Sequence, residues 1–177
     1  MKSIYAYEFT KVHGATGYLN DAFFTNAAKH AEIINKAEQQ KTSRLPHEAY
    51  LKHFVKDLQQ DVPLWAYVDL LTIADISFLY AISEPAIKAS VANAFGFTMS
   101  RNTEILGNFM HSMTIIRNLC AHGSRLYNRL FEQKLSLNKK EKALLITKDG
   151  HIDNSHLYGF ILIMRRLLQK NLGYGKF

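Results

Sequence analysis

The chain is poor in the residues that interrupt or cross-link a fold. Its 177 residues include one cysteine, Cys120, together with three prolines and nine glycines. A single cysteine excludes an internal disulfide framework and any zinc site built from several thiolates. Few prolines and glycines interrupt the chain, so we do not expect long loops or disordered tails.

Long apolar runs are also missing. The most apolar stretch, LWAYVDLLTIADISFLYAI, carries Asp69 and Asp75, and no window approaches the roughly 18 apolar residues of a membrane span. We therefore expect a buried helical hairpin here and no membrane partner. The first residues, MKSIYAYEF, do not resemble a secretory signal, and the single cysteine fits a reducing compartment. Together these features predict a cytoplasmic protein.

Acidic residues are scarce relative to basic ones. Lysine and arginine number 22 against 15 acids, giving a formal charge of +7 and a sequence pI near 9.4. An excess of positive charge favours phosphate-rich partners such as nucleic acid, through release of counterions. A basic but merely solvated surface is the alternative at this point.

Helical periodicity runs through nearly the whole chain. With 47% apolar residues, the length suits one compact core, and we predict a single all-α domain over residues 1–177. The segment LLITKDGHI departs from this helical pattern. Its Asp149-Gly150 pair favours a short β-hairpin near residues 144–152. Breaks and caps predict helices over about 3–12, 21–40, 46–59, 64 onward with a break at 72–75, 84–95, 100–120 and 155–172.

One segment carries candidate chemistry: MTIIRNLCAHGSRLYNRLF, residues 113–131. On a helix at about 100° per residue, one side is apolar and is predicted to be core: Ile115, Leu119, Leu126 and Leu130, with Ile116 and Cys120 beside them. The same wheel predicts a polar stripe of Asn118, His122, Arg125 and Arg129, toward which Arg117 can lean. Gly123 is expected to loosen the helix and turn His122 outward at a helix end.

This polar stripe has almost no acid to neutralise it, because Glu132 is the first carboxylate after Glu104. Unpaired like charges repel, and a bound polyanion would offset this repulsion. The pattern therefore favours a polyanionic partner. Arginine binds phosphate through its planar donors, and histidine, with an ordinary pKa of about 6.5, can exchange a proton at neutral pH. Because RNA supplies its own nucleophile, the 2′-hydroxyl, one base and one cation could suffice for cleavage. A structural histidine on a solvated or anion-binding stripe is the bland alternative.

The amino-acid sequence of this segment resembles the motif of a known family. Arg117 to His122 has the form R-N-x-x-x-H of HEPN ribonucleases, and RNLCAHGSRLYNR is similar to the R-N-x-C-A-H-x-x-R-L-W/Y-N-R hallmark of their Abi-like (abortive infection) branch. Upstream, HGATGYLN and the stretch holding His53, Pro63, Trp65 and Ser77 also look like that family. The resemblance covers most of residues 1–131.

The resemblance implies a HEPN-like helical bundle that works as a homodimer, with two arginine–histidine motifs in one composite site. It implies a metal-independent endoribonuclease that leaves a 2′,3′-cyclic phosphate, in phage defence or a toxin–antitoxin system. His122 would be the general base or acid, Arg117 would stabilise the scissile phosphate, and Asn118 would orient it. Arg125 and Arg129 would bind neighbouring RNA phosphates. No metal and no cofactor is expected, and a protein or RNA antitoxin is an expected partner.

Family members carry further helices ahead of the matching region, so we expect this chain to represent the C-terminal portion of the family domain. Two alternatives to an enzyme follow. The chain could be a non-catalytic module that binds RNA or an antitoxin in the same cationic cleft. It could also be a truncated regulatory fragment that pairs with a longer relative.

Overall fold

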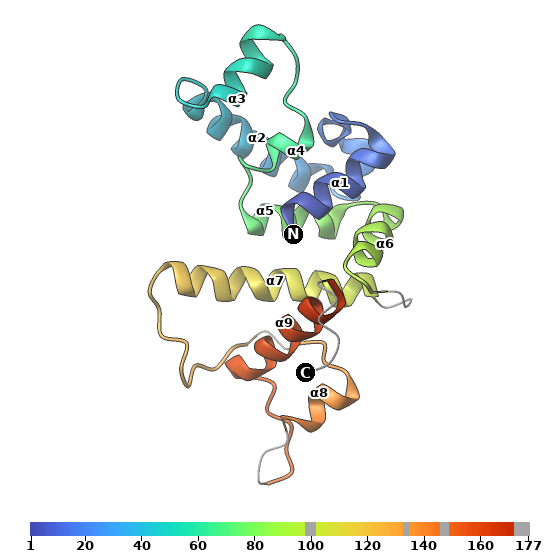
Figure 1. Cartoon of the computed structure of the whole chain (residues 1–177), viewed down its shortest axis with the longest axis vertical. Helices are drawn as coiled ribbons and strands as arrows, with labels where there is room; N and C mark the ends of the chain where they lie inside the picture. The colour runs from blue at the N-terminus through green and yellow to red at the C-terminus, as the bar shows by residue number, and fades with distance from the viewer. Residues whose placement is uncertain (98–101, 133–134, 146–148, 172–177) are drawn as a thin grey trace. The chain divides into compact units, whose positions relative to one another are not determined.

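The computed structural model describes residues 1–97, 102–132, 135–145 and 149–171 (Figure 1). The chain divides into two compact units, residues 1–94 and 95–177, and each is considered by itself. The prediction of one domain over residues 1–177 therefore stays a prediction.

The prediction of an all-α fold is confirmed. Every regular element among the described residues is helical. Isolated bridge residues occur at Phe24 and Ser83, which pair with each other, and at Ile152. Of the hairpin predicted over residues 144–152, residues 146–148 lie outside the described part. In its described flanks the N–H of Asp153 donates to the carbonyl of Leu145 at 3.0 Å, and Ile152 is an isolated bridge residue and not part of a strand.

The first unit consists of short helices. They are α1 (Lys2–His13), the 3₁₀ turns η1 (Gly17–Leu19) and η2 (Asp21–Phe23), α2 (Ala27–Arg44), α3 (Ala49–Lys52), the π turn η3 (His53–Asp57), α4 (Leu64–Tyr67), α5 (Ile73–Ile82) and α6 (Pro85–Ala94). The break predicted at 72–75 is confirmed, because Thr72 and Asp75 form a reciprocal capping box at the start of α5.

Two predicted helix starts are wrong. Asn20 caps only the 3₁₀ turn η2, by accepting from the N–H of Ala22, and the longer helix α2 begins after Asn26, which accepts from Lys29. Pro46 does not open a helix, since α3 begins at Ala49 and passes into the π turn. Capping residues recur in this region, and tertiary contacts decide which of them is used.

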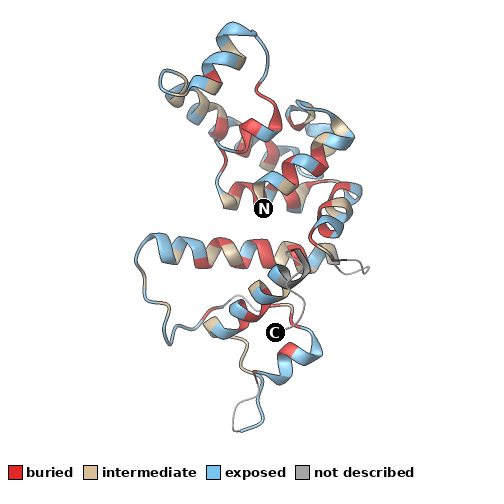
Figure 2. Ribbon diagram, viewed as in Figure 1, coloured by how far each residue is buried: buried red, intermediate tan, exposed pale blue. Residues whose placement is uncertain are grey.

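The core of the first unit surrounds α1, which packs against α4, α5 and α6. Buried tyrosines contribute to it beside leucine and isoleucine, and their hydroxyls find hydrogen-bond partners. The hydroxyl of Tyr5 shares a 2.9 Å hydrogen bond with Ser83, and that of Tyr18 donates to Val62 O at 2.8 Å. Hydrogen-bonded phenols of this kind stabilise a core without leaving an unsatisfied donor. The buried positions appear red in Figure 2.

The apolar stretch that contains Asp69 and Asp75 forms α4 and α5 within this unit. Asp75 is buried, and its carboxylate accepts from the Lys36 ammonium of α2 at 3.0 Å. Within the described part of the chain, none of the helices combines the length and apolarity needed to cross a membrane.

The second unit contains one long helix, α7 (Asn102–Ala121), with α8 (Lys139–Ala143) and α9 (Leu157–Asn171). Helices α7 and α9 pack together, and Phe160 of α9 lies 4.7 Å from Phe131 between ring centroids. Arg166 joins α9 to the start of α8 by donating to Glu141 and to Ser136 O, both at 3.2 Å. These contacts position the end of α7 and the segment that follows it.

Candidate functional site

The R-N-x-x-x-H motif lies at the C-terminal end of α7. The His122 N–H donates to Asn118 O at 3.0 Å, the Gly123 N–H to Cys120 O at 3.1 Å, and the Ser124 N–H to Leu119 O at 2.8 Å. With Gly123 at a φ of 62°, this is a Schellman ending. His122 is therefore the last residue on the helical ladder, and the expectation that Gly123 places it at a helix end is confirmed.

The last turn of α7 is exposed on nearly all sides (pale blue in Figure 2). Arg117, Asn118, Cys120 and His122 are exposed, whereas the core contacts of α7 come from earlier residues such as Leu106 and Met110. The histidine side chain and its neighbours are thus open to a ligand. Arg117 donates to the side-chain oxygen of Asn118 at 3.3 Å, so these two predicted site residues touch directly.

The prediction that one side of residues 115–130 forms core is wrong in part. Ile116 is buried, but Ile115, Leu119 and Leu126 are only half-buried, Cys120 is exposed, and Leu130 is 70% exposed. Two of these apolar residues follow the helix end, so the wheel no longer applies to them.

The predicted helical stripe ends with the helix at Ala121, so Arg125 and Arg129 do not continue it. The chain instead leaves α7 and turns at Asn128, which has a φ of 51°, a conformation that asparagine tolerates better than most residues. The Phe131 N–H then donates to Ser155 O at 2.7 Å, and Phe131 is buried. This anchored return path replaces the continuous helix that the sequence predicted.

The return path brings Arg129 back to α7. Ile115 and Leu119 of the helix, together with Arg129, Leu130, Phe131 and Glu132 of the returning segment, line a pocket of about 270 Å³. By helical spacing, His122 follows the row of Ile115 and Leu119, one turn further on. Arg129 and His122 therefore belong to the same side of α7, whereas Arg117 lies around the helix from them.

The basic side chains of the site have no acidic partners among the described residues. Arg117, Arg125, Arg129 and His122 form no ion pair there, although Glu132 lines the same pocket as Arg129. Charge is also distributed unevenly along the chain. Residues 95–177 hold 13 basic and 5 acidic residues, a formal charge of +8. Residues 1–94 hold 9 basic and 10 acidic residues, a formal charge of −1. The basic excess of the protein thus belongs to the unit with the motif.

Sequence reasoning missed the exposed apolar residues that accompany these cations. Tyr127 is 84% exposed and Leu130 is 70% exposed, beside the half-buried Ile115 and Leu119. The available signal was Gly123-Ser124, which ends helices often enough to question a continuous wheel. Among the described residues, no three side chains of histidine, cysteine, aspartate or glutamate gather as metal ligands.

These features define an all-α protein with an exposed arginine–asparagine–histidine helix end in its basic part. Residues 1–128 match the family described as Abi-like protein, and since this is more than half of the chain, the chain belongs to the Abi-like family. Membership associates it with abortive infection, a form of phage defence. Neither the curated proteins nor the solved structures contain a significant match to this chain.

Proposed function

We propose that this chain is a metal-independent endoribonuclease of the HEPN type that acts in the cytoplasm in phage defence or growth arrest. One observation carries the proposal: His122 is exposed at the end of α7, one turn from Arg117 and Asn118, without an acidic partner among the described residues. An open imidazole at a helix end, with guanidinium groups that lack acidic partners nearby in the chain, suits a phosphodiester substrate.

In the proposed reaction His122 removes the proton from a ribose 2′-hydroxyl. The 2′-oxygen attacks phosphorus, the bond from phosphorus to the 5′-oxygen breaks, and the 5′-oxygen takes a proton from an imidazolium. The products are a 2′,3′-cyclic phosphate and a free 5′-hydroxyl. Arg117 stabilises the charge that develops on the phosphoryl oxygens, while Asn118 holds the Arg117 side chain and contacts the phosphate.

Arg125 and Arg129 bind neighbouring phosphates in this proposal. Both are exposed and follow the helix end, so a strand that passes His122 can also pass them. Arginine suits this task because its fork of donors matches two phosphate oxygens.

The reaction has two proton transfers, which either one imidazole performs in turn or two imidazoles share. A homodimer that brings two His122 residues together would supply the second imidazole. The exposed apolar residues around the motif support this arrangement, since Tyr127 and Leu130 add surface that favours burial against another protein. A cognate antitoxin could cover the same surface in place of the second copy.

Cleavage is tested with purified protein and a panel of end-labelled RNAs. We expect His122→Ala and Arg117→Ala to lower the rate by a factor of about 10² or more, because each removes a group used in the transition state. His47→Ala and Arg44→Ala are matched controls in residues 1–94 and should cleave normally. Mass spectrometry should find a 2′,3′-cyclic phosphate on the upstream product.

Equal cleavage by the wild type and His122→Ala would contradict the enzymatic proposal. RNA binding without any product would favour the second candidate, a non-catalytic RNA- or antitoxin-binding module. The surface mixture of arginine with Tyr127 and Leu130 is the feature that favours this candidate, because it can also bind a protein.

A further inference from the structure

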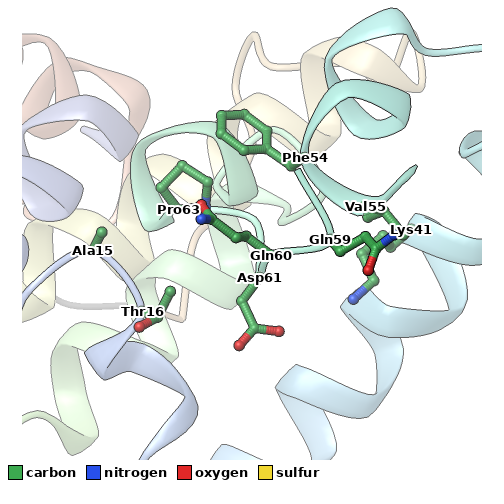
Figure 3. Close-up of a pocket in the computed structure, with 9 residues that line it drawn as sticks. All are labelled: Ala15, Thr16, Lys41, Phe54, Val55, Gln59, Gln60, Asp61 and Pro63. Carbon is green, nitrogen blue, oxygen red and sulfur yellow. The ribbon is translucent and has the colours of Figure 1, made fainter. Parts of the chain in front are cut away.

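A large pocket lies in the first unit, away from the motif in sequence. It has a volume of about 660 Å³ and is lined by three separate segments: Ala15 and Thr16 after α1, Lys41 of α2, and residues 54–63 (Figure 3). This volume falls within the range of about 300–1,000 Å³ that is usual for small-molecule sites.

An unusual backbone shapes one wall of this pocket. In the π turn η3 the Leu58 N–H donates to His53 O at 2.9 Å, and the Gln60 N–H reaches back to Phe54 O at 3.0 Å. Gln59 has a φ of 52°, in the left-handed region that a glutamine side chain disfavours. Wide helical turns and strained residues occur often at functional sites, because only a use for the geometry retains them.

The polar groups of this wall lack partners. Asp61, Gln59 and Gln60 are exposed, and within the described ranges of the chain their side chains form no hydrogen bond or ion pair. Lys41 differs, because its ammonium pairs with Glu38 of the same helix. The pocket therefore offers an unpaired carboxylate and two amides, while its one cation is already neutralised.

The same pocket has an aromatic wall. Phe54 is half-buried and packs edge-on against Trp65, with ring centroids 5.7 Å apart and planes at 75°. Trp65 is 62% exposed, so its ring is accessible beside Phe54. Aromatic rings beside unpaired polar groups are a common way for proteins to hold a nucleobase, by stacking and by hydrogen bonds to its edge.

We propose that this pocket binds a guanine base. Guanine presents two adjacent N–H donors, at N1 and N2, which the Asp61 carboxylate can accept together. Adenine and cytosine present one amino group and uracil presents one N–H, so none of them offers this donor pair to a carboxylate.

The base, and not a phosphate, is the group that the site recognises. Residues 1–94 hold 9 basic and 10 acidic residues, and the lining cation is paired, so little attracts a phosphate here. The guanine can belong to a free nucleotide or to an RNA strand, and the pocket chemistry is the same for both. The proposal does not depend on RNA cleavage.

Trp65 provides a direct readout, because it is the only tryptophan of the chain and packs on Phe54. The intact protein is titrated with guanosine monophosphate, adenosine monophosphate, and uncleavable 2′-O-methyl oligonucleotides with and without guanine, while tryptophan fluorescence is followed. A response to guanosine monophosphate indicates a free nucleotide, and a response only to guanine-containing oligonucleotides indicates an RNA strand. No response, or equal responses to guanine and adenine, would overturn the proposal.

An exchange of specificity gives the sharper test. Asp61→Asn replaces one acceptor by an N–H donor, so it should weaken binding of the preferred guanine probe by about tenfold or more. It should strengthen binding of the corresponding xanthine probe, whose C2 oxygen accepts a hydrogen bond where guanine donates one. Asp57→Asn is the matched control, since Asp57 lies four residues before Asp61 but pairs with His53 at 3.5 Å and does not line the pocket. Unchanged guanine binding by folded Asp61→Asn protein refutes the assignment.

Discussion

The backbone N–H of Ser124 donates to the carbonyl of Leu119 at 2.8 Å and closes the end of α7 over His122. The bond requires the left-handed conformation of Gly123 between the two residues. The direction in which the His122 side chain faces therefore depends on the conformation of the neighbouring glycine.

Gly123→Ala should destabilise the protein by about 1–2 kcal/mol, the cost of a left-handed residue with a Cβ. No atom lies within 4 Å of the added Cβ, so a clash contributes nothing. If the strain moves His122, RNA cleavage falls as well. Gly150→Ala is the control, because Gly150 has a φ of 78° and equally open surroundings. The unfolding temperatures of both variants should fall by similar amounts, and only Gly123→Ala should lose RNA cleavage. Equal cleavage by the two variants would show that the conformation of the helix end does not affect catalysis.

The number of RNA phosphates that the protein contacts can be measured from the salt dependence of the binding constant. For binding to an uncleavable single-stranded RNA, Arg117→Ala, Arg125→Ala and Arg129→Ala should each reduce the slope of log K against log salt by about 0.7. Arg44→Ala should leave the slope unchanged, because Arg44 is associated with Asp69 at 3.5 Å in the first unit. Titrations at four salt concentrations measure the slopes. If one of these three variants keeps the wild-type slope, the arginine that it replaces does not contact an RNA phosphate.

Leu130→Asp tests the proposed homodimer. Leu130 is 70% exposed and adjoins the pocket beside α7, so burial against a second copy should make it sensitive to charge. We expect dimerisation to weaken by about 2 kcal/mol, roughly thirtyfold. Sedimentation velocity over a concentration series gives the constant. Leu144→Asp, at a residue 55% exposed, is the control, and identical association of the two variants would argue against an interface at Leu130.

Asp75 should control stability in acid. Burial raises the pKa of Asp75, but hydrogen bonds from the side chain and N–H of Thr72 and from Lys36 outweigh it, so the pKa lies below its ordinary value. The stabilisation is complete above an unfolded-state pKa of about 3.9 and is lost as pH falls through the lower folded value. Asp75→Asn should cost about 1–3 kcal/mol at neutral pH.

The same variant has a characteristic pH profile. Chemical denaturation between pH 2 and 7 should show a smaller loss of stability in acid for Asp75→Asn than for the wild type, since the titrating group is gone. Asp57→Asn, whose carboxylate is largely exposed, should retain the wild-type profile. Parallel profiles for all three proteins would show that the Asp75 contacts contribute little.

Much of the helical organisation could be predicted from short-range patterns. Gly14 ends α1, Thr72 and Asp75 cap α5, and Pro85 opens α6, because caps and breakers act over one turn. The start of α2 was missed, since Asn20 and Asn26 are equally good caps and packing selects between them. Among the site residues, Arg117 and Asn118 are in contact, and His122 lies at the helix end that Gly123 predicted.

The order of residues alone establishes the Abi-like family, the helical class, the single cysteine and the concentration of positive charge in residues 95–177. These properties are local or additive along the chain. The return of Arg129 to Ile115, and the pocket assembled from residues 15–16, 41 and 54–63, arise from contacts distant in sequence, such as Phe131 on Phe160 and Ala15 with Leu64. Periodicity describes which side of a helix a residue faces, whereas the path after the helix depends on what the chain packs against next.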